Sequence, residues 1–347
     1  MNMKIEPDEK SLKEQIPYPD MTFPFCVWPD VYNLFDDCTV NTHWHYDFEY
    51  GYVLSGPIDY YINDTFIRLE TGDCIFVNSN MLHMSRQPKG CNNAVMFAVT
   101  FPPTLLTSDI NSTIYQKYFQ PIIDTQMEGF KIASNNSIGL KIATLLLELL
   151  AIQAHAPQQT QNTMPPSYWQ YYQLIFDSSR DEYRFPIDSQ IYRDITVCLK
   201  DQAKTEGYEF ECMKRVMQVL LFTLQHMKEN KSELLWHTDS LSQTERAKGI
   251  LAYIHTHFAE KITVEDIAKH MSISRSECFR CFKRFSNKRP LEYINEYRLT
   301  KAAKLLKETE TSITVIASNC GFESASYFSK TFKQNYAMTP VQYRKQR

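Results

Sequence analysis

The sequence lacks an apolar segment long enough to cross a membrane. Its longest mainly apolar stretch covers residues 142–152 and is interrupted by Glu148, whereas a membrane-spanning helix needs about 20 apolar residues. Residues 1–7 also lack the apolar core of a secretory signal peptide. We therefore expect a cytoplasmic protein with no membrane partner.

Cysteine is present but is not arranged as a disulfide framework. The nine cysteines of the 347-residue chain are scattered, which suits a reducing cytoplasm. Cys278 and Cys281 form a C-x-x-C pair, but a zinc ribbon needs a second such pair, which the sequence lacks. Because both would lie on the inner face of a helix, we interpret them as core residues, with a metal or redox role as the alternative.

An excess of positive charge is missing from the whole chain but present at one end. The full sequence has 37 Lys and Arg against 40 Asp and Glu, a net charge of −3. Residues 243–347 hold 19 basic and 10 acidic residues, whereas residues 1–242 hold 18 and 30. A basic module on an acidic body is expected when phosphate binding is confined to one domain. The length predicts two or three domains.

The basic end contains one pattern twice. The pattern is Phe-Lys, six residues, proline, two residues and tyrosine, and it starts at Phe282 and again at Phe332. A period of 50 residues indicates one supersecondary unit that is used twice, since two copies are too few for a solenoid.

Each copy predicts two short helices joined by a tight turn. In the first copy, Thr263 opens a helix, the turn falls at residues 271–273, and Ser274 caps the second helix in a capping box. In the second copy, Ser312 caps the first helix and Gly321 supplies the turn, where a positive φ is cheap only for glycine. With a basic outer face, this arrangement is typical of the helix-turn-helix motif, whose second helix enters the DNA major groove.

The outer faces of the two second helices form the predicted DNA-binding surface. Its residues are Arg275, Ser276, Phe279, Arg280, Lys283, Ser324, Ser326, Ser329, Lys330 and Lys333. Tyr327 is assigned to the inner face with Phe328 and Phe332. Because the first copy carries two arginines, we expect it to make more of the base-specific contacts.

A continuous helix over residues 291–307 is predicted between the copies, without glycine or proline. Such a helix could hold the two units rigidly, and adjacent major-groove faces recur about every 34 Å. One chain could then read two half-sites of double-stranded DNA. The alternative is a plain helical bundle with solvated basic faces, which would need neither the turn chemistry nor the repeat.

Residues 262–347 resemble the DNA-binding domain of the AraC/XylS family of transcription regulators. The resemblance is carried by Ile267-Ala268, Ser274, Phe282-Lys283, Pro290, Tyr293, Arg298, Ala302, Leu306, Ile316-Ala317, Gly321-Phe322, Tyr327-Phe328-Ser329, Phe332-Lys333, Thr339-Pro340 and Tyr343-Arg344. The glycine usual near the end of the second unit is replaced around residues 336–337. The resemblance implies a regulator that binds operator DNA as a homodimer, with RNA polymerase as a partner if it is an activator.

The region 23–101 contains short aromatic and β-branched runs bounded by turn residues, which predicts a β-sandwich or barrel. Residues 43–49, followed by Gly56, resemble the first cupin motif, and Gly72-Asp73 with His83 resembles part of the second. The predicted fold is therefore a cupin-like β-barrel of the jelly-roll type, a helical middle region, and an all-α C-terminal domain with two helix-turn-helix units.

The histidines of this barrel permit two interpretations. His43, His45 and Glu49 would project from one strand face, and His83 could be a fourth metal ligand. Cupin-like sensor domains of the resembled family typically bind an effector without metal, so we expect no metal, no cofactor and no catalysis. The predicted effector-binding residues are His43, His45, Tyr46, Glu49, Tyr61 and His83. A carbohydrate is favoured because rings stack on sugar C–H faces while imidazole and carboxylate groups meet hydroxyls.

Five segments are predicted along the chain: an N-terminal arm (1–22) that could close over the pocket, a cupin-like effector-binding domain (23–103), a helical dimerisation or interaction region (104–236), a linker (237–242) and the DNA-binding domain (243–347), with its units at about 262–285 and 312–335. An apolar stripe over residues 210–228 is either domain core or a dimer seam. Two other classes stay open, namely a metal-dependent cupin enzyme fused to a DNA-binding module and a ligand-independent DNA-binding regulator.

Overall fold

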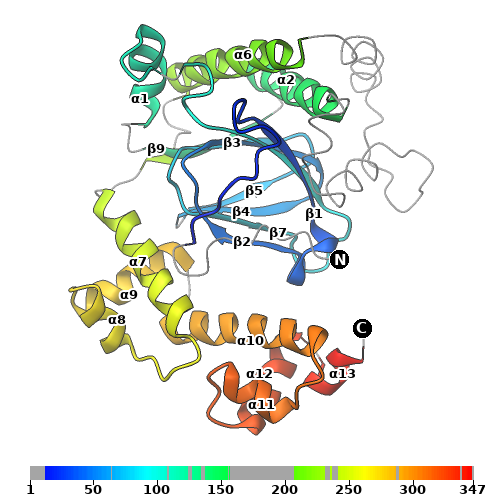
Figure 1. Cartoon of the computed structure of the whole chain (residues 1–347), viewed down its shortest axis with the longest axis vertical. Coiled ribbons are helices and arrows are strands. Elements are labelled where there is room, and N and C mark those ends of the chain that lie inside the picture. The colour runs from blue at the N-terminus through cyan, green and yellow to red at the C-terminus, as the bar shows by residue number, and fades with distance from the viewer. Residues whose placement is uncertain are drawn as a thin grey trace. The chain divides into compact units, whose positions relative to one another are not determined.

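The computed structural model describes residues 12–63, 65–107, 109–123, 127–133, 137–154, 156, 207–230, 235–236, 241–286, 289–336 and 338–345. They fall into two compact units, whose main parts are residues 13–240 and 241–347 (Figure 1). The division after Ser240 lies inside the predicted linker, most of which is outside the described residues.

The first unit contains two antiparallel sheets. The larger has the strand order β1-β8-β3-β6-β9-β10 and the smaller has the order β2-β7-β4-β5. The strands are β1 (Cys26–Val31), β2 (Thr39–His43), β3 (Phe48–Ser55), β4 (Ile58–Ile62), β5 (Thr65–Leu69), β6 (Cys74–Val77), β7 (His83–Arg86), β8 (Val95–Phe101), β9 (Met127–Ile132) and β10 (Leu235–Trp236). The predicted two-sheet barrel is confirmed. The turn before β6 has Gly72 at a φ of 91°, as its sequence predicts.

Short helical turns connect these strands: η1 (Tyr32–Leu34), η2 (Asp36–Cys38), η3 (Tyr115–Phe119) and α1 (Gln120–Ile123). Part of the interior between the sheets is occupied by an apolar cluster that includes Tyr32, Val53, Ile62 and Met96. This cluster leaves the polar residues of β2, β3 and β7 as a separate group within the barrel.

The prediction of a helical region over residues 104–236 is incomplete. Strand β9 lies within it and pairs with β6, and β10 pairs with β9. The sequence of β9 contains glycine and two charged residues, so its strand signal is weak and its long-range pairing decides the conformation. Gly129 is required there, because a Cβ would lie 2.2 Å from the carbonyl oxygen of Phe76.

Two helices, α2 (Ser137–Ala154) and α6 (Tyr208–Glu229), pack on one face of the larger sheet (Figure 1). Helix α2 is long and apolar enough to cross a membrane by length and composition, but 67% of it is buried here. Hydrogen bonds tie the layers together, since the Tyr50 hydroxyl lies 2.9 Å from Thr223 Oγ1 and the Tyr208 hydroxyl donates to Gln153 over 2.7 Å. The helical layer is thus part of the cupin unit.

The apolar stripe of α6 divides into two faces. Val216, Val219 and Leu220 are buried in the core against α2 and the sheet. Phe210, Met217 and Leu221 point outward and are 79%, 48% and 59% exposed. Both interpretations of the stripe therefore retain support, each for a different set of residues.

The second unit is all helical: α7 (Leu241–His257), α8 (Val264–His270), α9 (Arg275–Ser286), α10 (Pro290–Glu308), α11 (Ile313–Asn319), α12 (Ala325–Tyr336) and α13 (Pro340–Arg344). The local signals act as predicted. Thr263 forms a capping box with Asp266, Ser312 caps α11, and Ser272 and Gly321 take positive φ in the two turns.

The two helix-turn-helix units have separate cores that share one helix. Helix α10 contributes Ile294 to the first core, with Phe282, and Leu299 and Ala302 to the second, with Phe332. The predicted rigid connector is therefore packed into both units. Cys278 and Cys281 are buried in the first core as free thiols, which confirms the interpretation of the C-x-x-C pair as core residues.

The loop between α7 and α8 connects the two helix-turn-helix units of the DNA-binding domain. Arg298 of α10 donates from Nε to the Phe258 carbonyl and from Nη2 to the Glu260 carbonyl, both over 2.7 Å. A Cβ at Gly321 would lie 2.5 Å from that same Phe258 carbonyl oxygen. The turn of the second helix-turn-helix unit can therefore approach this loop only because residue 321 is glycine.

Gly321→Ala is expected to lower the free energy of unfolding of the C-terminal unit by roughly 2–4 kcal/mol, because it adds left-handed strain and a backbone clash. Gly90→Ala, in the cupin unit, is the control for left-handed strain alone, since Gly90 has a φ of 84° but open space around it; a loss of about 1 kcal/mol is expected for the unfolding of that unit. Urea denaturation followed by circular dichroism measures both. Equal losses would contradict the role of the Phe258 contact.

Candidate functional site

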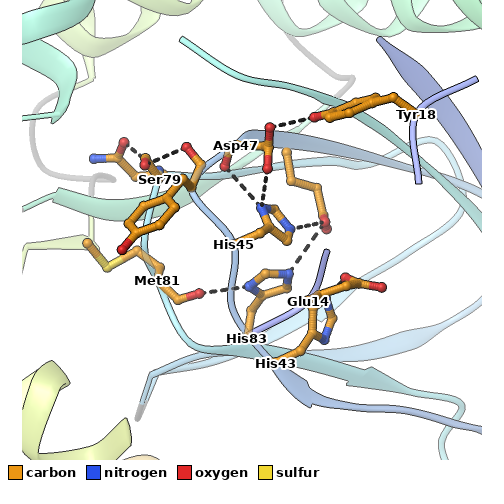
Figure 2. Close-up of polar contacts among 11 residues, drawn as sticks. Glu14, Tyr18, His43, His45, Asp47, Ser79, Met81 and His83 are labelled. Atoms are coloured by element: carbon orange, nitrogen blue, oxygen red, sulfur yellow. Dashed lines mark hydrogen bonds and ion pairs between the residues drawn. The ribbon is translucent and has the colours of Figure 1, made fainter. Parts of the chain in front are cut away.

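Four polar side chains converge inside the barrel. His43 ends β2, His45 follows it, Glu49 lies on β3 and His83 begins β7. All four are buried, and one potential ligand atom from each lies within 4.8 Å of the others. Figure 2 shows the three imidazoles directed toward one another. We call these four residues the histidine cluster.

Backbone carbonyls fix the tautomer of each imidazole. The Nδ1 atoms of His43, His45 and His83 lie 2.7, 3.2 and 2.9 Å from carbonyl oxygens of residues 41, 47 and 81. A carbonyl can only accept, so each Nδ1 carries the proton and donates it. In the neutral imidazoles, the three Nε2 atoms then present lone pairs.

Glu49 is oriented by a residue that the sequence analysis did not select. The Tyr60 hydroxyl donates to Glu49 Oε1 over 2.7 Å, which leaves Oε2 facing the Nε2 atoms of His45 and His83 at 3.3 and 3.4 Å. These separations exceed the about 2.7–2.9 Å of charge-assisted hydrogen bonds. Among the described residues, buried His83 Nε2 has no hydrogen-bond partner.

The electrostatics of the cluster reflect its burial. Burial raises the pKa of the Glu49 carboxyl, but the positive charges that the facing His83 and His45 carry when protonated outweigh this and hold that pKa well below its ordinary value. Burial and the two neighbouring imidazoles hold the pKa of His43 well below its usual range. The cluster therefore favours an ionised carboxylate beside a neutral His43.

Two further carboxyls face this group. Glu14 Oε2 lies 3.2 Å from His43 Nε2, and burial together with the charge of Glu49 raises the pKa of Glu14 to about 8. Asp30 on β1 likewise has a pKa raised well above its ordinary value by burial and by Glu49. An excess of buried acceptors and carboxyls without a matching cation is unfavourable.

The donor set fits a divalent first-row transition metal. Imidazole nitrogens and a carboxylate oxygen bind such ions at about 2.0–2.2 Å, which places neighbouring ligand atoms roughly 3–4 Å apart. The spacing in the histidine cluster is close to this range. The Nδ1 and Tyr60 hydrogen bonds supply the outer contacts that orient metal ligands. The geometry thus fits an ion, whereas the family resemblance predicts a metal-free site.

Two of the predicted effector-binding residues lie apart from the histidine cluster. Tyr46 is 54% exposed and stacks edge-on against Trp44. Tyr61 faces away from the cluster, where its hydroxyl accepts from Arg86 and its ring packs on Phe66. The alternation of β4 explains this, because Tyr60 points inward and Tyr61 outward.

Many aromatic rings of the barrel strands belong to the core and not to a ligand pocket. Phe48, Tyr50 and Phe76 are fully buried on the face of the larger sheet that packs against α2 and α6. They alternate along β3 and β6 with residues of the barrel interior. These rings therefore stabilise the sheet–helix packing and are not available to a ligand in the barrel.

The predicted DNA-binding residues of the first helix-turn-helix unit lie on an exposed face of α9. Arg275, Ser276, Phe279 and Arg280 are all exposed. The Arg275 guanidinium lies 2.7 Å from the Glu265 carboxylate, and Arg280 pairs with Glu277 of its own helix. Exposed pairs of this kind are worth little and can be exchanged for phosphate or base contacts. The side chain of Lys283 is outside the described residues.

The equivalent face of α12 carries Ser326, Lys330 and Lys333, which are exposed, and Ser329, which is partly buried. The hydroxyl of Ser324 accepts from the backbone N–H of Tyr327 over 3.2 Å, so Ser324 is the cap of α12, as Ser274 is of α9.

The assignment of Tyr327 to the inner face is wrong. Its side chain is 49% exposed, and its hydroxyl accepts from Asn295 over 3.3 Å. Phe322 and Phe328 already fill the core beside it. Tyr327 and Phe279 both line an open groove of about 1080 Å³ between the two helix-turn-helix units. The outer faces of α9 and α12 thus border one continuous depression.

Comparison with known proteins assigns both domains. Residues 267–346 match the family described as a helix-turn-helix domain, and residues 37–99 match the cupin domain family. The chain is 28% identical over 337 residues to the uncharacterized HTH-type transcriptional regulator YdeC of Bacillus subtilis (strain 168), covering 97% of each protein. It is 28% identical over 158 residues to the HTH-type transcriptional activator RhaS of Enterobacter sp. (strain 638), covering 46% of this chain and 54% of that protein.

Among solved structures, a transcriptional regulator with an AraC-type DNA-binding domain from Chromobacterium violaceum is 30% identical, with a TM-score of 0.29, over 31% of this chain and 96% of that one. The two matched domains and the similarity to YdeC along nearly the whole chain make this protein a transcriptional regulator that joins a cupin domain to a DNA-binding helix-turn-helix domain. Its helix-turn-helix domain is of the AraC type, as the sequence resemblance implied.

Proposed function

We propose that this chain is an effector-responsive regulator whose cupin domain holds a divalent first-row transition metal at His43, His45, Glu49 and His83. The convergence of three Nε2 lone pairs and one carboxylate oxygen in a buried space carries the proposal. When bound, such an ion supplies positive charge and open coordination positions for oxygen atoms of an effector.

The favoured effector is an oxygen-rich small molecule of the carbohydrate class. Its hydroxyl or carboxylate oxygens would meet the metal and the imidazoles of the cluster. The effector controls transcription only if it binds one arrangement of the protein more tightly than another. A sensing role fits the attached DNA-binding domain. The metal-dependent cupin enzyme is the second candidate, favoured by the same donor set.

The metal proposal predicts about one equivalent of tightly bound ion per chain after incubation with Mn²⁺, Fe²⁺, Co²⁺, Ni²⁺ or Zn²⁺ and dialysis. His83→Ala and Glu49→Gln should each lose most of it, because each removes one ligand. His257→Ala is the control, since His257 lies on α7 in the other unit. Elemental analysis measures the content.

Wild-type protein without bound ion under all five conditions would contradict the metal site. Thermal unfolding of loaded and chelator-treated protein with a panel of sugars and sugar acids then tests the effector class, because a ligand of the folded state raises the melting temperature. A carbohydrate that raises it equally in both preparations would bind without the metal.

We further propose that the outer faces of α9 and α12 contact adjacent major-groove segments of operator DNA. The support is their exposure, their shared 50-residue spacing and the positive charge of residues 243–347. Arg280 and Lys330 hold equivalent positions in the middle of the two helices, where side chains reach base edges. Lys333 lies nearer the end of α12 and is assigned to phosphate.

Arg280→Ala and Lys330→Ala should each weaken operator binding about 5- to 150-fold and reduce discrimination between operator and unrelated DNA, because each removes a base contact worth roughly 1–3 kcal/mol. Lys333→Ala should lower affinity for both DNAs alike. Anisotropy titrations at fixed salt measure these changes. Wild-type operator affinity in the first two variants would refute the assignment of their side chains.

The exposed face of α6 supports a homodimer. Phe210, Met217 and Leu221 place three large apolar side chains on one side of a helix that packs on the sheet with its other side. We assign a second copy of the chain to this face, because exposed apolar surface on a packed helix favours self-association.

Leu221→Lys should shift the protein from dimer to monomer, because it buries a charge in the interface. Val341→Lys is the control, since Val341 is similarly exposed at 52% but lies on α13. Sedimentation velocity over a range of concentrations measures the distribution. A dimer that persists in the first variant would exclude this face as the interface.

A further inference from the structure

The N-terminal segment brings an acidic side chain to the histidine cluster. We infer that Glu14 is an additional metal ligand, supplied by this segment, so that metal binding fastens the segment to the barrel. The inference rests on the proposed metal site. It adds a fifth protein ligand, which comes from outside the β-strands.

The backbone of the segment is positioned for this contact. The Glu14 N–H donates to the Trp44 carbonyl over 2.9 Å, and Lys13 forms a parallel bridge with Trp44. The residue between His43 and His45 therefore holds the segment. Because the bridge aligns residues 13–14 with residue 44, the Glu14 side chain lies beside the imidazole of His43 (Figure 2).

Two side-chain contacts flank Glu14 on either side. The Lys13 ammonium lies 4.3 Å from the centre of the Tyr46 ring. The Tyr18 hydroxyl donates to Asp47, whose own backbone carbonyl accepts from His45 (Figure 2). The segment is thus attached along the turn that carries His45, and Glu14 is its one residue directed at a cluster imidazole among the described residues 13–18.

The charges of the neighbouring groups explain why a bound ion would strengthen the contact between Glu14 and the histidine cluster. In the absence of a cation, the part-buried Glu14 carboxyl lies 3.2 Å from Nε2 of His43. With a divalent ion between these groups, the Glu14 and Glu49 carboxylates would each face a charge of opposite sign. The segment is consequently held more tightly when the ion is present.

The glutamate side chain at position 14 is long enough to reach the position of a metal ligand. Glu14 Oε2 is as close to His43 Nε2 as Glu49 Oε2 is to His45 Nε2, within 0.1 Å. The carboxylate oxygen therefore already lies at a ligand–ligand separation, about 3 Å, that a shared ion requires.

The test compares Glu14→Gln with Asp20→Asn. Both remove a carboxylate from the same segment without changing its size, but Asp20 is exposed and bonds only to Thr22 and the neighbouring backbone. Zinc affinity is measured by competition with a chromophoric chelator, and tryptic cleavage after Lys13 is followed by mass spectrometry with and without Zn²⁺.

Wild-type protein and Asp20→Asn should bind Zn²⁺ alike, and the ion should slow cleavage after Lys13 in both. Glu14→Gln should still bind one equivalent, with a Kd raised about 10- to 100-fold, and the ion should no longer slow cleavage. Wild-type affinity and protection in Glu14→Gln would overturn the inference while leaving the four-residue site intact. Absence of zinc binding in the wild-type protein would overturn both.

Discussion

The side-chain alternation of β3 is the constraint on which the cupin unit depends. Phe48 and Tyr50 point to one face of the larger sheet and pack under α2 and α6, while Glu49 between them points into the barrel. Because β3 pairs with β6 on one side and β8 on the other, its register is fixed at both edges. A slip by one residue would bury the carboxylate in the helical layer and expose an aromatic ring to the histidines. Core packing and site geometry are therefore set by the same strand.

The sequence predicted those features that depend on neighbouring residues. Caps at Thr263 and Ser312 and the turn at Gly321 act over three or four positions, and each forms as expected. Strand β9, the Tyr60–Glu49 hydrogen bond and the approach of Glu14 to His43 join residues that are 11 to more than 50 positions apart. No local pattern encodes such distances. The alternation of β4 could have selected Tyr60 over Tyr61, since Tyr60 shares its face with Ile58 and Ile62.

Tyr327 shows that helical spacing alone does not decide which aromatic ring is buried. Helical spacing places it beside Phe328, so an inner position is reasonable, but Phe322 from the turn already occupies that part of the core. The volume of the second core is filled by residues from three helices and a turn, and only their assembly decides which ring is excluded. The excluded ring of Tyr327 lines the groove between the two helix-turn-helix units, next to the face that carries the positive charge.

Helix α10 belongs to both cores of the DNA-binding domain, and Arg298 fastens it to the loop against which Gly321 packs. Neither unit can turn about the helix axis without breaking one of these contacts. On DNA, one base pair corresponds to about 34° of rotation around the duplex. If both units contact DNA as proposed, the domain fixes the rotational phase between two half-sites. Inserting or deleting a single base pair between them would change their relative orientation by an angle that the protein cannot follow, so spacing carries information alongside sequence.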